Sequence, residues 1–174
     1  YLPVVSLFSG RIFDMDDLDR VILSILQEDG RATVTDIASR VGLSLSACHR
    51  RIRELEATGV IRGYHADLDN ELLGLPFEAL VFVTMRAGDS ASVAAFEAGV
   101  QAVPNIVQAY RLFGEPDYQL LVRAASKQHY QQLYDESLSQ LPGVQRLTST
   151  LVMKTVVAPH TPVSTADVHT SPRR

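Results

Sequence analysis

Arginine side chains recur on one face of a helix predicted between residues 45 and 58. At about 100° per residue, Arg50 and Arg53 point away from the apolar positions, and His49 and Arg51 lie on their flanks. An arginine fork matches the two acceptors on a guanine edge or the oxygens of a phosphate. Small hydroxyl side chains at the start of the same helix permit close approach to phosphates. The candidate DNA contacts are therefore Ser44, Ser46, His49, Arg50, Arg51 and Arg53.

Two shorter helices are predicted before this one. Apolar residues recur every three or four positions from Asp17, and this first helix ends near Gly30. Thr33 and Asp36 have the spacing of a capping box, in which the hydroxyl binds one backbone N–H and the carboxylate binds another. The second helix starts there and ends at Gly42, a residue suited to the left-handed conformation. A third helix then follows directly.

The arginine-bearing helix and the strand after it complete a winged helix-turn-helix over residues 14–65. Ser44 is expected to cap this helix, and residues 60–64 have the composition of a short strand. Its buried face is predicted at Leu45, Cys48, Ile52 and Leu55. The alternative is a solvated basic face on an ordinary three-helix unit.

Composition limits the remaining function classes. The net charge of −4 argues mildly against nucleic acid, but residues 40–65 hold five arginines against two glutamates. The single cysteine, Cys48, excludes an internal disulfide framework and indicates a reducing, cytoplasmic setting. We expect no metal and no cofactor, since no cysteine–histidine cluster has the spacing of metal ligands. No apolar run is long enough for a membrane span. Residues 1–8 lack the features of a secretory signal, and residues 1–13 are a flexible arm, an edge strand or a cloning remnant.

From residue 77 onward, strand and helix patterns alternate. Strands are predicted at 77–87, 106–113, 118–124 and 144–157, with helices at about 93–103 and after Ser126. The order β-α-β-β-α-β gives a ferredoxin-like antiparallel sheet with both helices on one face, so the fold class is α+β. Residues 66–76 are a linker, and residues 158–174 are a flexible tail. Apolar residues on the other sheet face predict a partner sheet from a second subunit.

The chain resembles the leucine-responsive and asparagine-operon regulators (the Lrp/AsnC family) over about residues 15–157. The matching stretches are LDRVILSILQEDGRATVTDIASRVGLSLSACHRRIRELEATGVIRGY, the FGEPDYQLLVRA hairpin and the closing LPGVQRLTSTLVMKTV. The resemblance implies a DNA-binding domain followed by a sheet domain that dimerises, with further assembly into tetramers or octamers. It also implies control of amino-acid metabolism genes, with an amino acid bound between dimers.

The resemblance also suggests effector-binding residues. The family's ligand loop has a Gly-x-x-Asp pattern, which Gly114 and Asp117 match. A glycine lets a ligand carboxylate approach backbone N–H groups and an aspartate can pair with an α-ammonium, but the same residues also suit a plain hairpin turn. Pro116 departs from the family pattern and leaves the ligand open. Further candidates are Arg111, as a carboxylate clamp or a solvated strand residue, Tyr118, and Thr150 with Leu151 at effector-response positions.

Three functions remain to be separated. The first is a regulator, not an enzyme, that reads near-palindromic double-stranded DNA as a dimer and responds to an amino acid. The second is an enzyme on the same scaffold that decarboxylates a haem precursor. Related enzymes rely on histidines in the second domain, whose folded part offers only His129. The third is an amino-acid sensor whose helix-turn-helix only supports assembly, against which the outward arginines argue.

Overall fold

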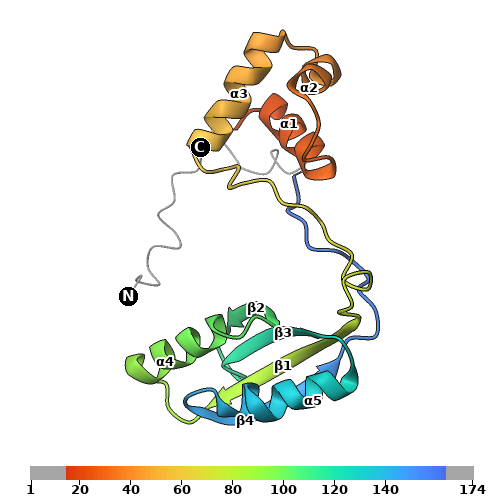
Figure 1. Cartoon of the computed structure of the whole chain (residues 1–174). Coiled ribbons are helices and arrows are strands. Elements are labelled where there is room, and N and C mark those ends of the chain that lie inside the picture. The colour runs from red at the N-terminus through yellow and green to blue at the C-terminus, as the bar shows by residue number, and fades with distance from the viewer. Residues whose placement is uncertain (1–14, 164–174) are drawn as a thin grey trace. The chain divides into compact units, whose positions relative to one another are not determined.

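The computed structural model describes residues 15–163 of the 174-residue chain, so the predictions for residues 1–13 and for most of the tail lie outside that range. The described residues form two compact units (Figure 1). One contains residues 15–66 with residues 158–163, and the other contains residues 67–157. Within the described part, no helix is long and apolar enough to cross a membrane.

Three helices make up most of the first unit. They are α1 (Asp17–Glu28), α2 (Val34–Val41) and α3 (Leu45–Ala57), at the predicted positions. Their apolar faces meet in one core, which contains Ile22, Ile25, Ile37, Ala38, Cys48, Ile52 and Leu55. The Cys48 side chain is fully buried, and burial raises the pKa of its thiol. It therefore acts as a small apolar residue.

Local caps explain where these helices begin and end. The Thr33 hydroxyl accepts the Asp36 N–H at 3.2 Å, but it also donates to the Asp36 carboxylate, so the reciprocal half of the expected capping box is not formed. A full capping box occurs instead at the start of α1, between Asp16 and Asp19. Gly42 ends α2 with φ +70°, as its predicted role requires.

Two further expectations for the first unit are wrong. Leu45 is 55% exposed rather than buried, because it is the first residue of α3 and the core is reached only from Cys48 onward. Residues 60–64 are not a strand: they are irregular and have no pairing partner among the described residues. This wing segment is instead held to α3, where Tyr64 donates a hydrogen bond to the Glu56 carboxylate at 3.0 Å.

The second unit has the predicted β-α-β-β-α-β order. Its elements are β1 (Phe77–Met85), α4 (Ser90–Gln101), β2 (Ile106–Arg111), β3 (Tyr118–Ala124), α5 (Lys127–Glu136), the short 3-10 helix η2 (Leu138–Gln140) and β4 (Val144–Leu151). The strands form one antiparallel sheet in the order β2-β3-β1-β4. The last strand is shorter than predicted: β4 ends at Leu151, which stands opposite Ala79 of β1.

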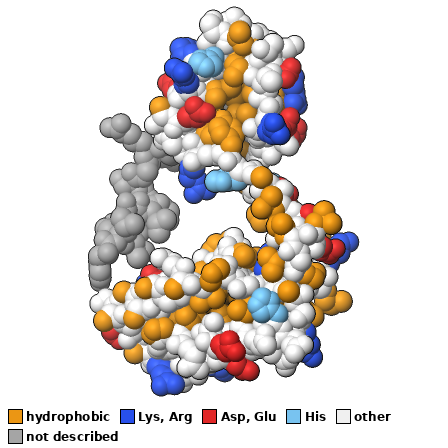
Figure 2. Space-filling view, in the orientation of Figure 1, with side chains coloured by type: hydrophobic (Ala, Val, Ile, Leu, Met, Phe, Trp, Pro, Cys, Tyr) orange, Lys and Arg blue, Asp and Glu red, His pale blue; other side chains and the backbone are white. Residues whose placement is uncertain are grey.

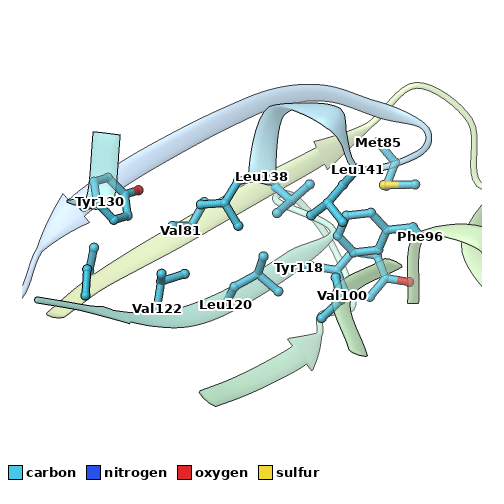
Figure 3. Packing of buried hydrophobic residues seen from close by; sticks show 13 residues of the cluster. Val81, Met85, Phe96, Val100, Tyr118, Leu120, Val122, Tyr130, Leu138 and Leu141 are labelled. Atoms are coloured by element: carbon cyan, nitrogen blue, oxygen red, sulfur yellow. The ribbon is translucent and has the colours of Figure 1, made fainter. Parts of the chain in front are cut away.

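One face of the sheet carries the core of this unit. Every second residue of β1 from Ala79 onward and of β3 is buried, and these side chains meet Phe96 of α4 and Tyr130 of α5 (Figure 3). The residues between them point to the other face, which neither α4 nor α5 covers (Figure 1). That open face carries the partly buried Leu80, Phe82 and Leu121.

Candidate DNA-binding face and effector loop

The outer side of α3 carries most of the predicted DNA contacts. Ser44 caps the helix by accepting the Ala47 N–H at 3.3 Å, and its hydroxyl lies 3.3 Å from that of Ser46. His49, Arg50 and Arg53 are exposed along the same helix. Basic and histidine side chains gather over this part of the unit in Figure 2. We define the DNA-binding face by these exposed residues, namely Ser44, Ser46, His49, Arg50 and Arg53.

Arg51 lies apart from this face, although it is adjacent in sequence. Its guanidinium lies 2.8 Å from the Asp16 carboxylate and 2.8 Å from the Asp19 carboxylate, and its side chain is 21% exposed. The hydrogen bond to Asp19 is the main cause that raises the pKa of Arg51. Since both aspartates cap α1, Arg51 joins α3 to the beginning of α1. In this position both terminal nitrogens of its guanidinium already contact a carboxylate.

Leu45 is a surface residue that sequence reasoning assigned to the core. It follows the Ser44 cap and is 55% exposed, which adds an apolar group to the N-terminal end of the DNA-binding face. The N-terminal residues of a recognition helix contact base edges, and an apolar side chain there can pack against the methyl group of thymine. The sequence signal that could have indicated this exposure is the position of Leu45 directly after the Ser44 cap.

The predicted effector loop joins β2 to β3. Gly114 has φ +127° and is exposed. The Asp117 N–H donates to the Val83 carbonyl at 2.9 Å, and one Asp117 carboxylate oxygen accepts the Met85 N–H at 2.7 Å. This bond lies where the pairing of β1 with β4 shifts by one residue. The Asp117 side chain therefore fastens the loop to the end of β1.

Two other predicted effector residues lie on the helix-covered face of the sheet. Tyr118 is 3% exposed, packs against Phe96 with its ring tilted by 45°, and donates a hydrogen bond to the Glu97 carboxylate at 2.8 Å. Burial, followed by that hydrogen bond, raises the pKa of Tyr118 to about 12. The Arg111 guanidinium lies 4.0 Å from the same Glu97 oxygen. Tyr118 is thus bound to α4, whereas Arg111 is 60% exposed beside the same carboxylate.

The remaining two predicted effector residues lie toward the far end of β4. Thr150 and Leu151 stand opposite Leu80 and Ala79, near the start of β1, whereas the effector loop meets the end of β1. Within one chain the six predicted residues consequently form three separate groups: the loop pair, the pair beside Glu97, and the pair on β4.

Sequence reasoning missed a hollow that lies beside the loop. It has a volume of about 450 Å³ and is lined by Phe82, Thr84, Glu115, Pro116, Arg146 and Thr148. No local pattern marks Arg146, because only the pairing of β4 with β1 brings it near the loop. Among the described residues, no group of three histidine, cysteine or acidic side chains could hold a metal ion.

Comparison with known proteins decides the family. The profile of the Lrp/AsnC ligand binding domain matches residues 78–162, and a winged helix-turn-helix DNA-binding profile matches residues 15–62. The transcriptional regulatory protein DoeX of Halomonas elongata is 36% identical over 90% of this chain and 99% of its own length. The chain belongs to the Lrp/AsnC family.

Other members of the Lrp/AsnC family agree with this assignment. The leucine-responsive regulatory protein of Escherichia coli is 36% identical over 82% of this chain and 87% of its own length. A Neisseria meningitidis transcriptional regulator, solved as a complex with L-Met, superposes with a TM-score of 0.79 at 33% identity. That match covers 86% of this chain and 96% of the other. Both expected domains of the family are therefore present in this chain.

Proposed function

We propose that this Lrp/AsnC protein is a cytoplasmic transcriptional regulator that binds double-stranded DNA through α3 and responds to an amino acid. The observation that carries the proposal is the exposed face of α3, where Arg50 and Arg53 stand beside the hydroxyls of Ser44 and Ser46. This set combines guanidinium forks for base edges or phosphates with small donors for close approach. Relatives named as transcriptional regulators support it.

The DNA half is tested with sites selected from a random double-stranded library, followed by gel-shift titration. The double variant Arg50→Gln/Arg53→Gln should bind its selected site at least tenfold more weakly, because a bidentate base contact contributes about 1–3 kcal/mol. Lys127→Gln removes one exposed positive charge outside α3 and serves as the control. Unchanged affinity of the double variant would contradict the assignment. Failure to select any DNA site would favour the alternative of an amino-acid sensor whose helix-turn-helix only supports assembly.

The same proposal includes a dimer built through the open sheet face. Leu80 and Leu121 stand opposite each other on that face, so the apolar surface continues across β1 and β3. A two-fold dimer would place two α3 helices on near-palindromic half-sites about one DNA turn apart, and dimers would assemble further into tetramers or octamers. The selected DNA sites should accordingly show inverted symmetry.

The effector half is tested by thermal unfolding against each of the twenty amino acids. A ligand at 100 times its dissociation constant stabilises the folded state by about 2.7 kcal/mol, so a true effector should give a clear rise in melting temperature. The leucine-responsive relatives and the L-Met complex of the Neisseria regulator make leucine and methionine the first candidates. If no amino acid shifted the melting temperature, amino-acid sensing would be contradicted, but the proposed DNA binding would not be affected.

We further propose that the chain is not an enzyme. The decarboxylase alternative depends on His129, whose Nδ1 accepts the Ala125 N–H at 3.1 Å at the start of α5. That ring nitrogen is occupied by a helix-start hydrogen bond and is outside the hollow beside the loop. An assay with a haem precursor should show no decarboxylation, and measurable turnover would restore the enzyme alternative.

A further inference from the structure

Leu45 is an exposed apolar residue on a helix whose other exposed residues are polar or small. It is the first residue of α3, and its side chain is 55% exposed. The described part of the first unit exposes two other large apolar side chains, Val21 on α1 and Tyr64 in the wing segment. Leu45 is therefore the one large apolar group that α3 presents to solvent within the described residues.

The start of α3 is positioned by residues other than Leu45. Leu43 packs, partly buried, against the core of the first unit, and Cys48 is the first fully buried residue of the helix. Ser44 caps the helix by accepting the Ala47 N–H at 3.3 Å. Because these contacts already fix the helix start, the exposed part of the Leu45 side chain is available for contact with another molecule.

Two predicted DNA contacts lie on the same side of α3 as Leu45. His49 and Arg53 follow it at intervals of four residues, and residues with this spacing form a row along one face of a helix. Both are exposed. If this row contacts the major groove, Leu45 is its N-terminal member. The N-terminal residues of a recognition helix are those that approach base edges.

The base edges of the major groove determine what an apolar side chain can recognise there. Thymine presents its C5 methyl group, whereas guanine, adenine and cytosine are distinguished by their donors and acceptors. A leucine side chain has neither donor nor acceptor, so it would cover a polar edge without satisfying it, at a cost in free energy. Thymine is thus the base that Leu45 fits best.

We propose that Leu45 is a specificity-determining residue that recognises a thymine in each half-site through its C5 methyl group. The inference rests on the DNA binding proposed above and names one base of the operator. The same contact extends to 5-methylcytosine, which carries a methyl group on the same ring carbon. Exchanging thymine for uracil, or cytosine for 5-methylcytosine, changes only this methyl group. Both exchanges therefore isolate the contact from hydrogen bonding.

The test measures the affinity of the full chain for its selected DNA site by gel-shift titration. Each thymine of the half-site is replaced in turn by uracil. At the thymine that contacts Leu45, this exchange should weaken wild-type binding about fourfold in one half-site and about fifteenfold in both, as expected for one buried methyl group. With cytosine at that position, methylation of its C5 should strengthen binding by a similar factor.

Three variants separate a methyl contact of Leu45 from other effects. Leu45→Ala removes three carbon atoms of the contact and should lose most of the preference for thymine over uracil. Leu45→Met should keep most of it, because methionine is apolar and of similar volume. Val21→Ala removes an exposed apolar side chain from α1 and should keep the wild-type ratio. The ratio is the decisive quantity, since general damage to the fold weakens binding to both sites equally.

Other results would overturn the role of Leu45. A thymine preference that persists in Leu45→Ala would assign the methyl contact to another residue. A uracil scan without effect at any position would show that no thymine methyl group is recognised. In both cases, wild-type binding to the selected site would still support the proposed DNA binding. If the library yields no site at all, DNA binding and the role of Leu45 fail together.

Discussion

Arg50 and Arg51 are neighbours in sequence but have different surroundings. Arg50 is 70% exposed on the side chain, and its one described ion pair is with Glu54 on the same helix at 3.5 Å. Arg51 is enclosed by the carboxylates of Asp16 and Asp19, of which Asp19 is 9% exposed. Exposure thus separates a residue able to contact DNA from one that positions α3. The two roles have distinguishable signatures in the salt dependence of DNA binding.

We predict that Arg51→Gln leaves the salt dependence unchanged, whereas Arg50→Gln lowers it if Arg50 contacts a phosphate. Each lost phosphate contact reduces the slope of log K against log salt by about 0.9. Arg51→Gln should instead destabilise the first unit by about 2 kcal/mol, because the Asp19 carboxylate loses its charged hydrogen-bond partner. Titrations at several salt concentrations, with urea unfolding, measure both quantities. A lower slope for Arg51→Gln would show that Arg51 also contacts a phosphate and belongs to the DNA-binding face.

A second residue-scale prediction concerns alkaline pH. The pKa of Tyr118 is raised to about 12, first by burial and then by its hydrogen bond to Glu97. The ordinary value of an unfolded tyrosine is about 10, so the folded state retains this proton longer than the unfolded state. The resulting stability is therefore fully present below pH 10 and is lost as the pH rises toward 12. In Tyr118→Phe, the free energy of unfolding measured in urea should fall less steeply between pH 9 and 12 than in the wild type. An equally steep fall would show that Tyr118 does not cause this loss of stability.

At the scale of elements, the turn between α2 and α3 sets the direction of the recognition helix. Gly42 ends α2 in the left-handed conformation, with φ +70° and no heavy atom near the position of an added Cβ. The expected penalty of Gly42→Ala is therefore conformational rather than steric, about 1–2 kcal/mol. Gly88→Ala is a matched control, because Gly88 also has open space around it but no positive φ.

Thermal unfolding of both glycine variants measures this difference. Gly42→Ala should lower the melting temperature of the first unit, and Gly42→Asn should lower it less, since asparagine tolerates the left-handed region better. Gly88→Ala should have little effect. Equal effects of the two alanine substitutions would show that the left-handed conformation at Gly42 is not what stabilises the turn.

Local signals in the sequence predicted most elements, because helix ends are chosen by nearby residues. Ser44 and Ser126 cap their helices, and Gly42 ends α2, each through contacts within four residues. Features that depend on distant residues were not predictable in this way. The engagement of Arg51 joins positions 32 residues apart, and Arg146 reaches the hollow only through the register of β4 with β1. Likewise, the local pattern did not predict that β4 ends at Leu151.

At the scale of the whole molecule, the open sheet face is the surface through which we propose that two copies assemble. Leu80 and Leu121 form a cross-strand pair on that face, which neither α4 nor α5 covers (Figure 1). An apolar face of this kind is stabilised when a second copy buries it. In the proposed dimer, DNA affinity would depend on assembly, because a monomer offers one α3 to a site with two halves.

We predict that Leu121→Asp converts the protein to monomers and weakens DNA binding. A charge on this face would be buried without a partner in the dimer, at a cost of several kcal/mol. Gln128→Asp introduces the same charge on the exposed side of α5 and should leave the dimer intact. Light scattering after size exclusion gives the mass, and circular dichroism verifies the fold. The monomer should also show about half the wild-type salt slope, since half the phosphate contacts are lost. A Leu121→Asp protein of unchanged mass would show that assembly uses another surface.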